Sequence, residues 1–269
     1  MEVIIVKDAA ELARTASAII AEQVKAKPDS VLGLATGSTP EDTYKLLIKA
    51  HQEDALDFSG VTTFNLDEYL GLPKDHEQSY HWFMHDRLFN HVNIKPENIN
   101  LPDGTTKDPE AEGARYEEKI AAAGGIDLQL LGVGSDGHIG FNEPGSSLAS
   151  RTRVKTLTEQ TIKDNARLFF GGNESEVPRF SLTMGVASIM DARRLLLLAS
   201  GPRKADVIQA LVEGPVTASV TASVLQMHQY ATVVVDEEAA AKLEHGEYFR
   251  WIQSQKSEYN KLRERLAAG

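Results

Sequence analysis

The chain has 269 residues, no cysteine and a net charge of −11, with 42% apolar and 25% charged residues. This length and composition allow one large domain whose core needs no covalent staples. The missing cysteines exclude disulfides, thiolate metal sites and cysteine nucleophiles, and the acidic balance argues against a general nucleic-acid binder. No stretch resembles a membrane span, and residues 1–7 lack the basic leader of a signal peptide. We therefore expect a cytoplasmic protein.

Short apolar runs alternate with amphipathic helices along the chain. We expect strands at 31–35, 61–65, 126–134, 195–199 and 231–236, and helices at 41–50, 80–90, 109–122, 204–212, 237–243 and 248–266. Such a pattern is typical of a parallel sheet covered on both faces. It predicts a single domain over 1–269, an open, doubly wound, mostly parallel α/β sheet of Rossmann-like type. The polar segment 151–180 interrupts the pattern, which indicates a mobile lid.

The first loop of interest follows the strand at 31–35, at the sheet edge where ligands bind in such folds. Residues 36–40 read Thr-Gly-Ser-Thr-Pro. Gly37 allows a close backbone approach, and the hydroxyls of Ser38 and Thr39 precede a helix N-terminus, where anions bind. The lysine element of a Walker loop is missing. An ordinary Ser/Thr helix cap before proline explains these residues about equally well.

The second loop follows the strand at 61–65 and contains Asp67, Glu68 and Tyr69. A carboxylate at a strand end can act as a general base on a substrate carbon. An aspartate that caps a turn is the commoner role for such a residue. Neither the acidic neighbour nor the tyrosine decides between the two.

The third loop, residues 132–145, combines five glycines with Asp136, His138 and Glu143. Glycine at this density predicts a backbone held in unusual angles near a ligand. A carboxylate can hold an imidazole in one tautomer and increase its basicity. We therefore interpret the three side chains as an acid–base group.

Two other patterns are weak. His81 and His85 have i, i+4 spacing but lack the glutamate of the HExxH zinc motif, so a plain helix face explains them better. Residues 132–137 match a dinucleotide fingerprint, but they follow a late strand, and Pro144 soon interrupts any helix. We expect no metal and no cofactor.

Together, the three loops resemble the glucosamine-6-phosphate deaminase family. The stretches that carry the resemblance are 32–40, 64–73, 132–145, 150–158 and 181–186, in the family's order over nearly the whole chain. The resemblance implies conversion of glucosamine 6-phosphate to fructose 6-phosphate and ammonia. The nearest alternative is lactone hydrolysis by a 6-phosphogluconolactonase, although Glu143 five residues after His138 matches the deaminases. A non-enzymatic sugar-phosphate sensor is the second alternative, against which the full set of acid–base residues argues.

The resemblance also implies a role for each residue. Asp67 matches the base that moves a proton between carbons 2 and 1 of the opened sugar. His138, assisted by Asp136 and Glu143, matches the group that opens the ring. The implied substrate-phosphate ligands are Thr36, Gly37, Ser38, Thr39, Arg167 and Lys204. Ser38 stands where many relatives have glycine, which leaves the loop geometry open.

Regulation follows from the resemblance as well. In the hexameric branch of the family, N-acetylglucosamine 6-phosphate activates the enzyme by binding between subunits. The matching positions are Ser146, Arg153, Lys155 and Tyr248. Arg153 and Lys155 share one face of an extended segment, which suits a second phosphate site, although a solvated basic strand is the simpler explanation. We expect a homo-oligomer, with a hexamer favoured.

Overall fold

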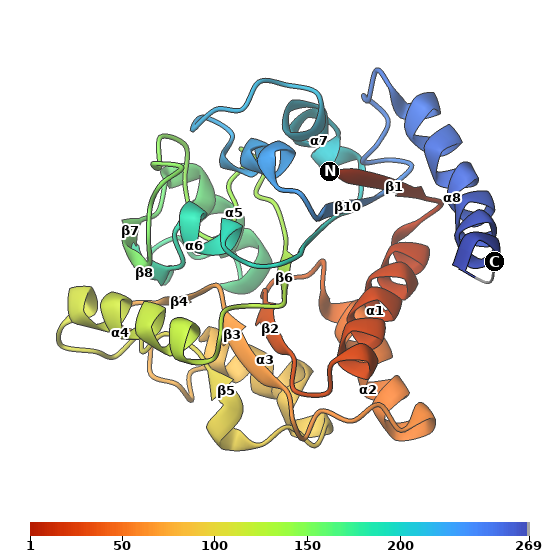
Figure 1. The fold of residues 1–269 in the computed structure, drawn as a ribbon. Coiled ribbons are helices and arrows are strands. Elements are labelled where there is room, and N and C mark those ends of the chain that lie inside the picture. The colour runs from red at the N-terminus through yellow and green to blue at the C-terminus, as the bar shows by residue number, and fades with distance from the viewer. Residues whose placement is uncertain (268–269) are drawn as a thin grey trace.

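The computed structural model describes residues 1–267, and its centre is a parallel sheet with helices on both faces (Figure 1). Its seven strands follow the order β1-β10-β9-β6-β2-β3-β5, and each neighbouring pair is parallel. Their bounds are Glu2–Val6 (β1), Val31–Leu34 (β2), Thr62–Asn65 (β3), Ile99–Asn100 (β5), Leu128–Leu131 (β6), Leu195–Ala199 (β9) and Ala231–Asp236 (β10). The predicted fold class is confirmed.

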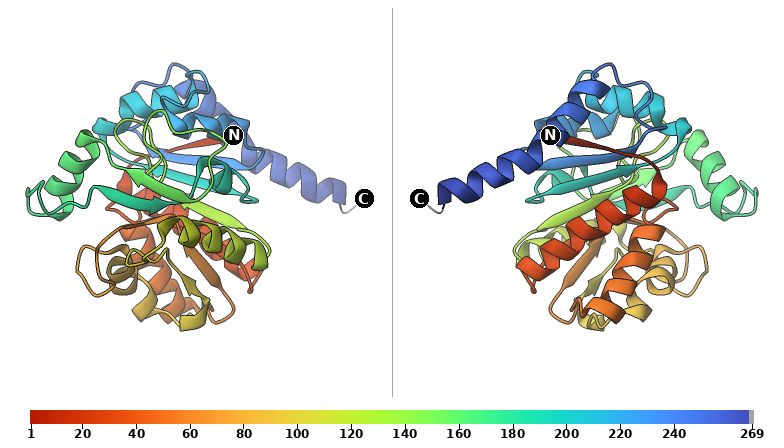
Figure 2. Two further views of the ribbon diagram at one scale, coloured as in Figure 1. Left: turned by 90° about the vertical axis from the view of Figure 1, so that its left-hand side faces the viewer. Right: turned by 90° about the vertical axis from the view of Figure 1, so that its right-hand side faces the viewer.

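Helices cover both faces of this sheet. They are α1 (Ala9–Ala26), α2 (Glu41–Asp54), α3 (Tyr80–Arg87), α4 (Pro109–Ala122), α5 (Glu159–Phe169), α6 (Val186–Met190), α7 (Ala205–Val212) and α8 (Gly246–Ala267), with 3-10 turns at Phe89–His91, Pro96–Asn98, Pro202–Lys204 and Thr221–Met227. α1 and α2 pack together on one face, and α4 lies on the other (Figure 2). In the described part of the chain, no helix is long and apolar enough to span a bilayer.

The central strands owe their position to continuous apolar sequence. Every residue of β2, β6 and β9 is buried, as expected where helices cover both faces of a sheet. The one large polar side chain among them, Gln129, lies over Gly33, where an added Cβ would come within 1.9 Å of its Oε1. Because residue 33 of β2 is a glycine, the neighbouring strand β6 has room for the Gln129 side chain.

A second, antiparallel sheet lies beside the main one, on the left in Figure 1. Its strands are β4 (Asp67–Tyr69), β8 (Phe180–Thr183) and β7 (Arg153–Thr156), in that order. A small apolar cluster packs around Tyr69, Phe141 and Phe170 and extends to Leu157 and Val177. Segment 151–180 thus has a core of its own that includes α5, and its mobility as a lid stays a prediction.

The structure corrects several expected elements. The helix predicted at 237–243 is wrong, because this stretch forms turns. The Asp236 carboxylate accepts the backbone N–H of Ala239 and also that of Gly201, and these hydrogen bonds fix the chain just after β10. Strand β1, helix α1 and the antiparallel sheet were not foreseen. The helix expected at 41–50 continues to Asp54, and the one expected at 80–90 ends as α3 at Arg87.

Candidate active site

The loops that follow β2, β3 and β6 meet at the carboxyl edge of the main sheet. They line a pocket of about 180 Å³, which residues 165–169 of α5 cover from the side. An adjoining hollow of about 620 Å³ shares Ser38, Thr39 and His138 with this pocket and reaches Lys204. The structure therefore brings all three loops together in one cleft.

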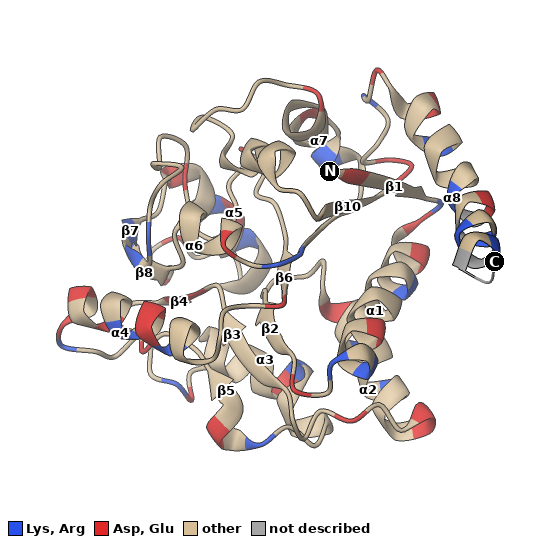
Figure 3. Cartoon of the chain, viewed as in Figure 1, with Lys and Arg blue, Asp and Glu red and all other residues tan. Residues whose placement is uncertain are grey.

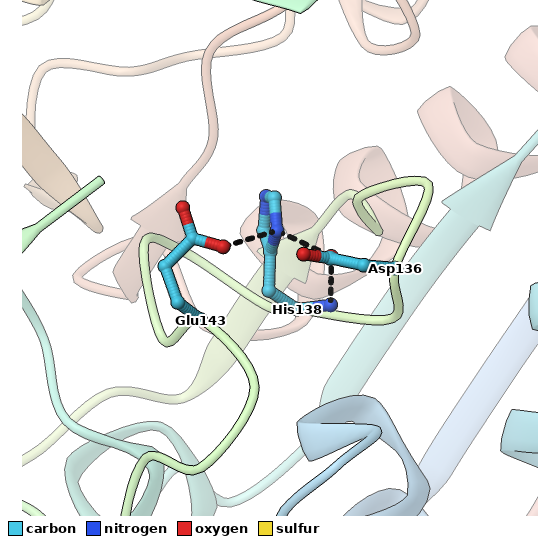
Figure 4. Close-up of side chains that lie close together, drawn as sticks. All are labelled: Asp136, His138 and Glu143. Atoms are coloured by element: carbon cyan, nitrogen blue, oxygen red, sulfur yellow. Dashed lines mark hydrogen bonds and ion pairs between the residues drawn. The ribbon is translucent and has the colours of Figure 1, made fainter. Parts of the chain in front are cut away.

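His138 lies between two carboxylates (Figure 4). Its Nδ1 is 2.7 Å from Asp136 Oδ1 and 3.5 Å from Glu143 Oε2, and its backbone N–H donates to Asp136 Oδ1 at 3.1 Å. Hydrogen bonding to Asp136 and the charge of its carboxylate together hold the ring. With both acids at Nδ1, the other ring nitrogen, Nε2, is the one left for a substrate.

Two glycines let the third loop take this form. At Gly134 an added Cβ would come within 2.2 Å of the His138 ring. Gly140 has φ of +54°, and a Cβ there would lie 2.9 Å from Thr183 Oγ1 and 3.4 Å from Asp67 Oδ2. A side chain at either position would displace the histidine or the aspartate, which explains why glycines surround the acid–base group.

The charges in the cleft set the protonation of this group. Burial by itself would lower the pKa of His138, but hydrogen bonding to and charge from Asp136 and Glu143 raise it to about 9. Burial would raise the pKa of Asp136, but its interactions with His138 lower it to about 2. At neutral pH the histidine is therefore an imidazolium, held by ionised Asp136, and can act as an acid.

Asp67 and Glu68 are adjacent in sequence, but their carboxylates have different surroundings. Asp67 lines the pocket, and burial, followed by the charge of Glu68, raises its pKa to about 8. Within residues 1–267, no N–H or O–H group donates to the Asp67 carboxylate. Glu68 instead accepts the backbone N–H groups of Tyr69, Tyr80 and His81, each at 2.9 Å. Asp67 is thus left for a substrate, whereas Glu68 anchors the start of α3.

The expected phosphate ligands lie at the other side of the cleft. Thr36, Gly37, Ser38 and Thr39 line it, and no side chain caps α2, which disfavours the plain helix-cap interpretation. Gly37 has φ of +102°, whereas Ser38 has an ordinary negative φ, so the serine fits the loop without strain. Lys204 donates to the Val133 carbonyl at 2.6 Å, and burial lowers its pKa.

Arg167 approaches the same hollow from α5. Its guanidinium lies 3.5 Å from Asp164 Oδ1, and Asp164 also accepts the hydroxyl of Ser135 at 3.0 Å. Arg203 lines the hollow next to Lys204. Three basic side chains therefore gather around the space beside the Ser38–Thr39 loop, where they can meet an anionic group.

The fold agrees with comparisons to known proteins. The profile of a family described as glucosamine-6-phosphate isomerases/6-phosphogluconolactonase matches residues 7–234. A glucosamine-6-phosphate deaminase of Shewanella loihica is 53% identical over 268 residues, covering 100% of this chain and 98% of the relative. Glucosamine-6-phosphate deaminase 2 of Bacillus subtilis is 53% identical over 90% of this chain and 98% of its own.

The chain belongs to the glucosamine-6-phosphate deaminase family.

Solved structures place it within the same group. A structure described as a monomeric glucosamine-6-phosphate deaminase matches with a TM-score of 0.88 and 48% identity, over 90% of this chain and 100% of its own. A 6-phosphogluconolactonase from Trypanosoma cruzi matches with a TM-score of 0.73 and 24% identity, over 90% and 97%. The second likeness is one of fold alone, whereas the deaminase family is shared in sequence as well.

The residues that match the family's effector site are spread over the chain. Arg153 and Lys155 lie on one face of β7, which appears basic in Figure 3, and Arg153 donates to Asn142 Oδ1 at 2.9 Å. Ser146 is buried, and its hydroxyl has no partner among the described residues. Tyr248 is exposed on α8, at the opposite side of the molecule from β7 (Figure 1). A single chain therefore does not bring the four together.

Two groups of side chains could be considered for a metal. Ligand atoms of Asp136, His138 and Glu143 lie within 4.8 Å of one another. Both carboxylates face the same ring nitrogen, and the raised pKa of His138 keeps a proton there, so the geometry suits a shared proton better than a cation. The rings of His81 and His85 are 4.5 Å apart on α3, outside the cleft.

Sequence reasoning missed several residues of the cleft. Tyr80 lines the pocket, and its ring stacks on Phe141 with centroids 6.0 Å apart. Asn165, on α5, lines the pocket and donates to the Tyr69 hydroxyl at 2.7 Å. Both stand in helices with no motif around them, so nothing in the local sequence marked them.

Proposed function

We propose that the protein converts glucosamine 6-phosphate into fructose 6-phosphate and ammonia by acid–base catalysis. The observation that carries this proposal is that one cleft holds both a base and an acid. The base is the Asp67 carboxylate, which accepts no hydrogen bond from the described residues, and the acid is the His138 imidazolium. The cations of Arg167 and Lys204 lie in the adjoining hollow. A base, an acid and an anion anchor are what this reaction requires of a protein.

His138 opens the sugar ring. Because Asp136 and Glu143 both face Nδ1, Nε2 carries the proton that can be given to the ring oxygen. The C1–O5 bond breaks as the ring oxygen takes this proton and the 1-hydroxyl gives its own proton to a water molecule, which leaves an aldehyde at carbon 1. The two carboxylates stabilise the imidazolium and hold its orientation.

Asp67 then moves the proton. The aldehyde acidifies the hydrogen on carbon 2, and the carboxylate removes it to give an enolamine. Return of the proton to carbon 1 gives an imine at carbon 2, to which water adds before ammonia leaves. Burial raises the pKa of Asp67, which makes the carboxylate a stronger base than one in water. A substrate ammonium group beside it favours its ionised form.

The phosphate is held by the loop at 36–39 with Arg167 and Lys204. Lys204 donates to a backbone carbonyl, and among the described side chains Arg167 pairs only with the partly exposed Asp164. Both can therefore turn their remaining N–H groups to a phosphate. Arg167 and Lys204 line the adjoining hollow, whereas Asp67 lines the pocket, which fits a sugar whose reacting carbons and phosphate are at opposite ends.

Lactone hydrolysis is the alternative function. Glu143 supports the deaminase, because its carboxylate joins His138 to the start of α5 by accepting the N–H of Thr158 at 3.2 Å. The test is ammonia release from glucosamine 6-phosphate beside hydrolysis of 6-phosphogluconolactone by the same preparation. We expect rapid ammonia release and little lactone hydrolysis. The reverse result would overturn the proposal.

We also propose a cytoplasmic homo-oligomer, favouring a hexamer, that N-acetylglucosamine 6-phosphate activates. Support comes from the exposed Tyr248 on α8, which could meet β7 only across a subunit contact, and from the paired cations of β7. Arg153 contacts Asn142, the neighbour of Glu143, so an effector on β7 has a short physical route to the acid–base group. The segment 151–180 acts as the mobile lid over the cleft.

A further inference from the structure

A separate pocket of about 380 Å³ lies between α3, the β5 region and the end of α4. It shares no lining residue with the substrate cleft. The first turn of α3 borders both, since Tyr80 lines the cleft and His81 lines this pocket. The backbone N–H groups of these two residues donate to the same Glu68 carboxylate at 2.9 Å.

The charge of this pocket is unusual for a chain of net charge −11. Lys74 approaches from the loop before α3, His81 and His85 from α3, and Lys119 from the last turn of α4. No carboxylate is among the lining residues. Among the described side chains, neither lysine forms an ion pair. The two ammonium groups repel each other, and they repel each histidine when it is protonated. Glu68 and Asp103 offset part of the charge of Lys74 from outside the pocket, and an anion inside the pocket would lower the remaining repulsion.

In each histidine, one ring nitrogen already interacts with another group of the protein. The backbone of Lys74 interacts with the His81 ring and favours its protonated form, and Nδ1 of His85 lies 3.2 Å from Asn90 Oδ1. The interacting nitrogen must carry hydrogen to donate to an oxygen acceptor. The second nitrogen is therefore a donor only when the ring is protonated, which makes a protonated pair the form that receives an anion.

We propose that this pocket binds a small phosphorylated anion, at a site distinct from the substrate cleft. A metal ion on the i, i+4 histidine pair is disfavoured, because the ammonium groups of Lys74 and Lys119 share the space and repel a cation. The volume falls in the range of small-molecule sites, roughly 300–1,000 Å³. Pro96, Ile99 and Leu101 provide an apolar wall for the carbon part of such a ligand.

Binding depends on pH through the histidines. Burial, then the charges of His85 and Lys74, lower the pKa of His81. The basic groups that line the pocket with His81 are His85, Lys74 and Lys119 of α4, and no charged residue from the β5 region lines it. The Glu68 carboxylate is tied to backbone N–H groups at the start of α3, and Asp103 lies near Lys74. An anion raises the pKa of His81 by stabilising the charged form of the ring. The affinity for the anion therefore falls as pH rises through the lowered pKa of the free ring, which lies below its ordinary value of 6.5.

The test follows the ring signals of His81 and His85 by NMR while inorganic pyrophosphate is added to the full chain at pH 6. We expect both signals to move and the lowered pKa of His81 to rise. Lys74→Ala/Lys119→Ala should weaken pyrophosphate binding at these rings by at least about tenfold, the loss expected from a charged hydrogen bond. Lys49→Ala, a surface lysine of α2, is the matched control and should change nothing.

Pyrophosphate can also enter the substrate cleft, so Lys204→Ala is titrated in parallel. The response of His81 and His85 should persist in this variant, even though binding in the cleft weakens. The proposal is overturned if neither ring responds to pyrophosphate at pH 6. It is also overturned if the double variant responds like the unmodified chain, or if Zn²⁺ moves the two signals and pyrophosphate does not. None of these outcomes depends on whether the protein releases ammonia.

Discussion

At the scale of single residues, Asp67 is distinguished by a buried carboxylate that accepts no hydrogen bond from any residue the structure describes. Asp67→Asn keeps the size of the side chain and removes the base. We expect kcat to fall by about 10²–10⁴-fold, the usual contribution of a general base, with substrate binding retained. Exchange of the carbon 2 hydrogen in D₂O should fall in parallel, since it reports the same proton transfer. Turnover close to normal would remove Asp67 from this role.

The same substitution should stabilise the fold at alkaline pH. The pKa of Asp67 in the folded protein is about 8, above its ordinary value of 3.8. Between these values the folded chain keeps a proton that the unfolded chain has lost, so stability declines as pH rises through this window. Asparagine carries no such cost. Urea unfolding should show Asp67→Asn gaining stability over the unmodified chain between pH 5 and pH 9, and a constant difference would contradict the buried-carboxylate explanation.

Glu143 should set the alkaline limb of the pH profile. Asp136 and Glu143 together raise the pKa of His138 to about 9, so kcat/KM should fall as pH rises through that value and the imidazolium is lost. Glu143→Gln removes one of the two charges, and the limb should move to lower pH. The substrate's own amino group titrates identically with both enzymes, so the difference between the two profiles reports His138. An unmoved limb would mean that another group is the acid.

At the scale of elements, α5 is held over the cleft by few contacts. One of them is the hydrogen bond from Asn165 to the buried Tyr69 hydroxyl, at 2.7 Å, and Tyr69 itself does not line the pocket. Tyr69→Phe removes this bond, worth about 0.5–1.5 kcal/mol, and should favour an open lid.

We expect KM to rise a few-fold with little change in kcat, and backbone hydrogen exchange at 159–169 to become faster. Tyr230→Phe, at an exposed tyrosine, is the control. Unchanged exchange in α5 would show that the small apolar cluster around Phe170, and not this hydrogen bond, holds the segment in place.

At the scale of the whole molecule, the outstanding question is assembly. The proposal of a hexamer predicts a solution mass six times that of the chain, measured by light scattering. Kinetics should be sigmoidal and become hyperbolic with N-acetylglucosamine 6-phosphate, since an effector that prefers one state shifts the equilibrium by about 1–3 kcal/mol. Lys155→Ala should abolish the response and leave maximal turnover intact. A monomer with hyperbolic kinetics, indifferent to the effector, would contradict both parts.

The middle of the main sheet could be predicted because β2, β6, β9 and β10 are apolar runs that fit burial on both faces, whereas its edge strands β1 and β5 were not foreseen. The third loop could be predicted because glycines and titratable side chains seldom gather so densely without a ligand. The turns at 237–243 could not, because their conformation depends on Asp236 meeting Gly201, which is far away in sequence. The antiparallel sheet could not, because β4, β7 and β8 are short and partly polar, and β4 pairs with a strand more than a hundred residues later.

Asp67 and Glu68 show most clearly what the sequence determines and what only the folded structure decides. The local sequence placed Asp67 and Glu68 at a strand end and identified both as acids near a ligand edge. Only the family resemblance assigned the role of base to Asp67, and it gave no physical reason for the difference. Their roles depend on β4, because consecutive side chains of a strand point to opposite faces. One face of β4 turns Asp67 into the cleft, and the other turns Glu68 to the backbone N–H groups of α3. Only the pairing of β4 with β8 fixes which residue faces which way, and that pairing is a property of the folded chain.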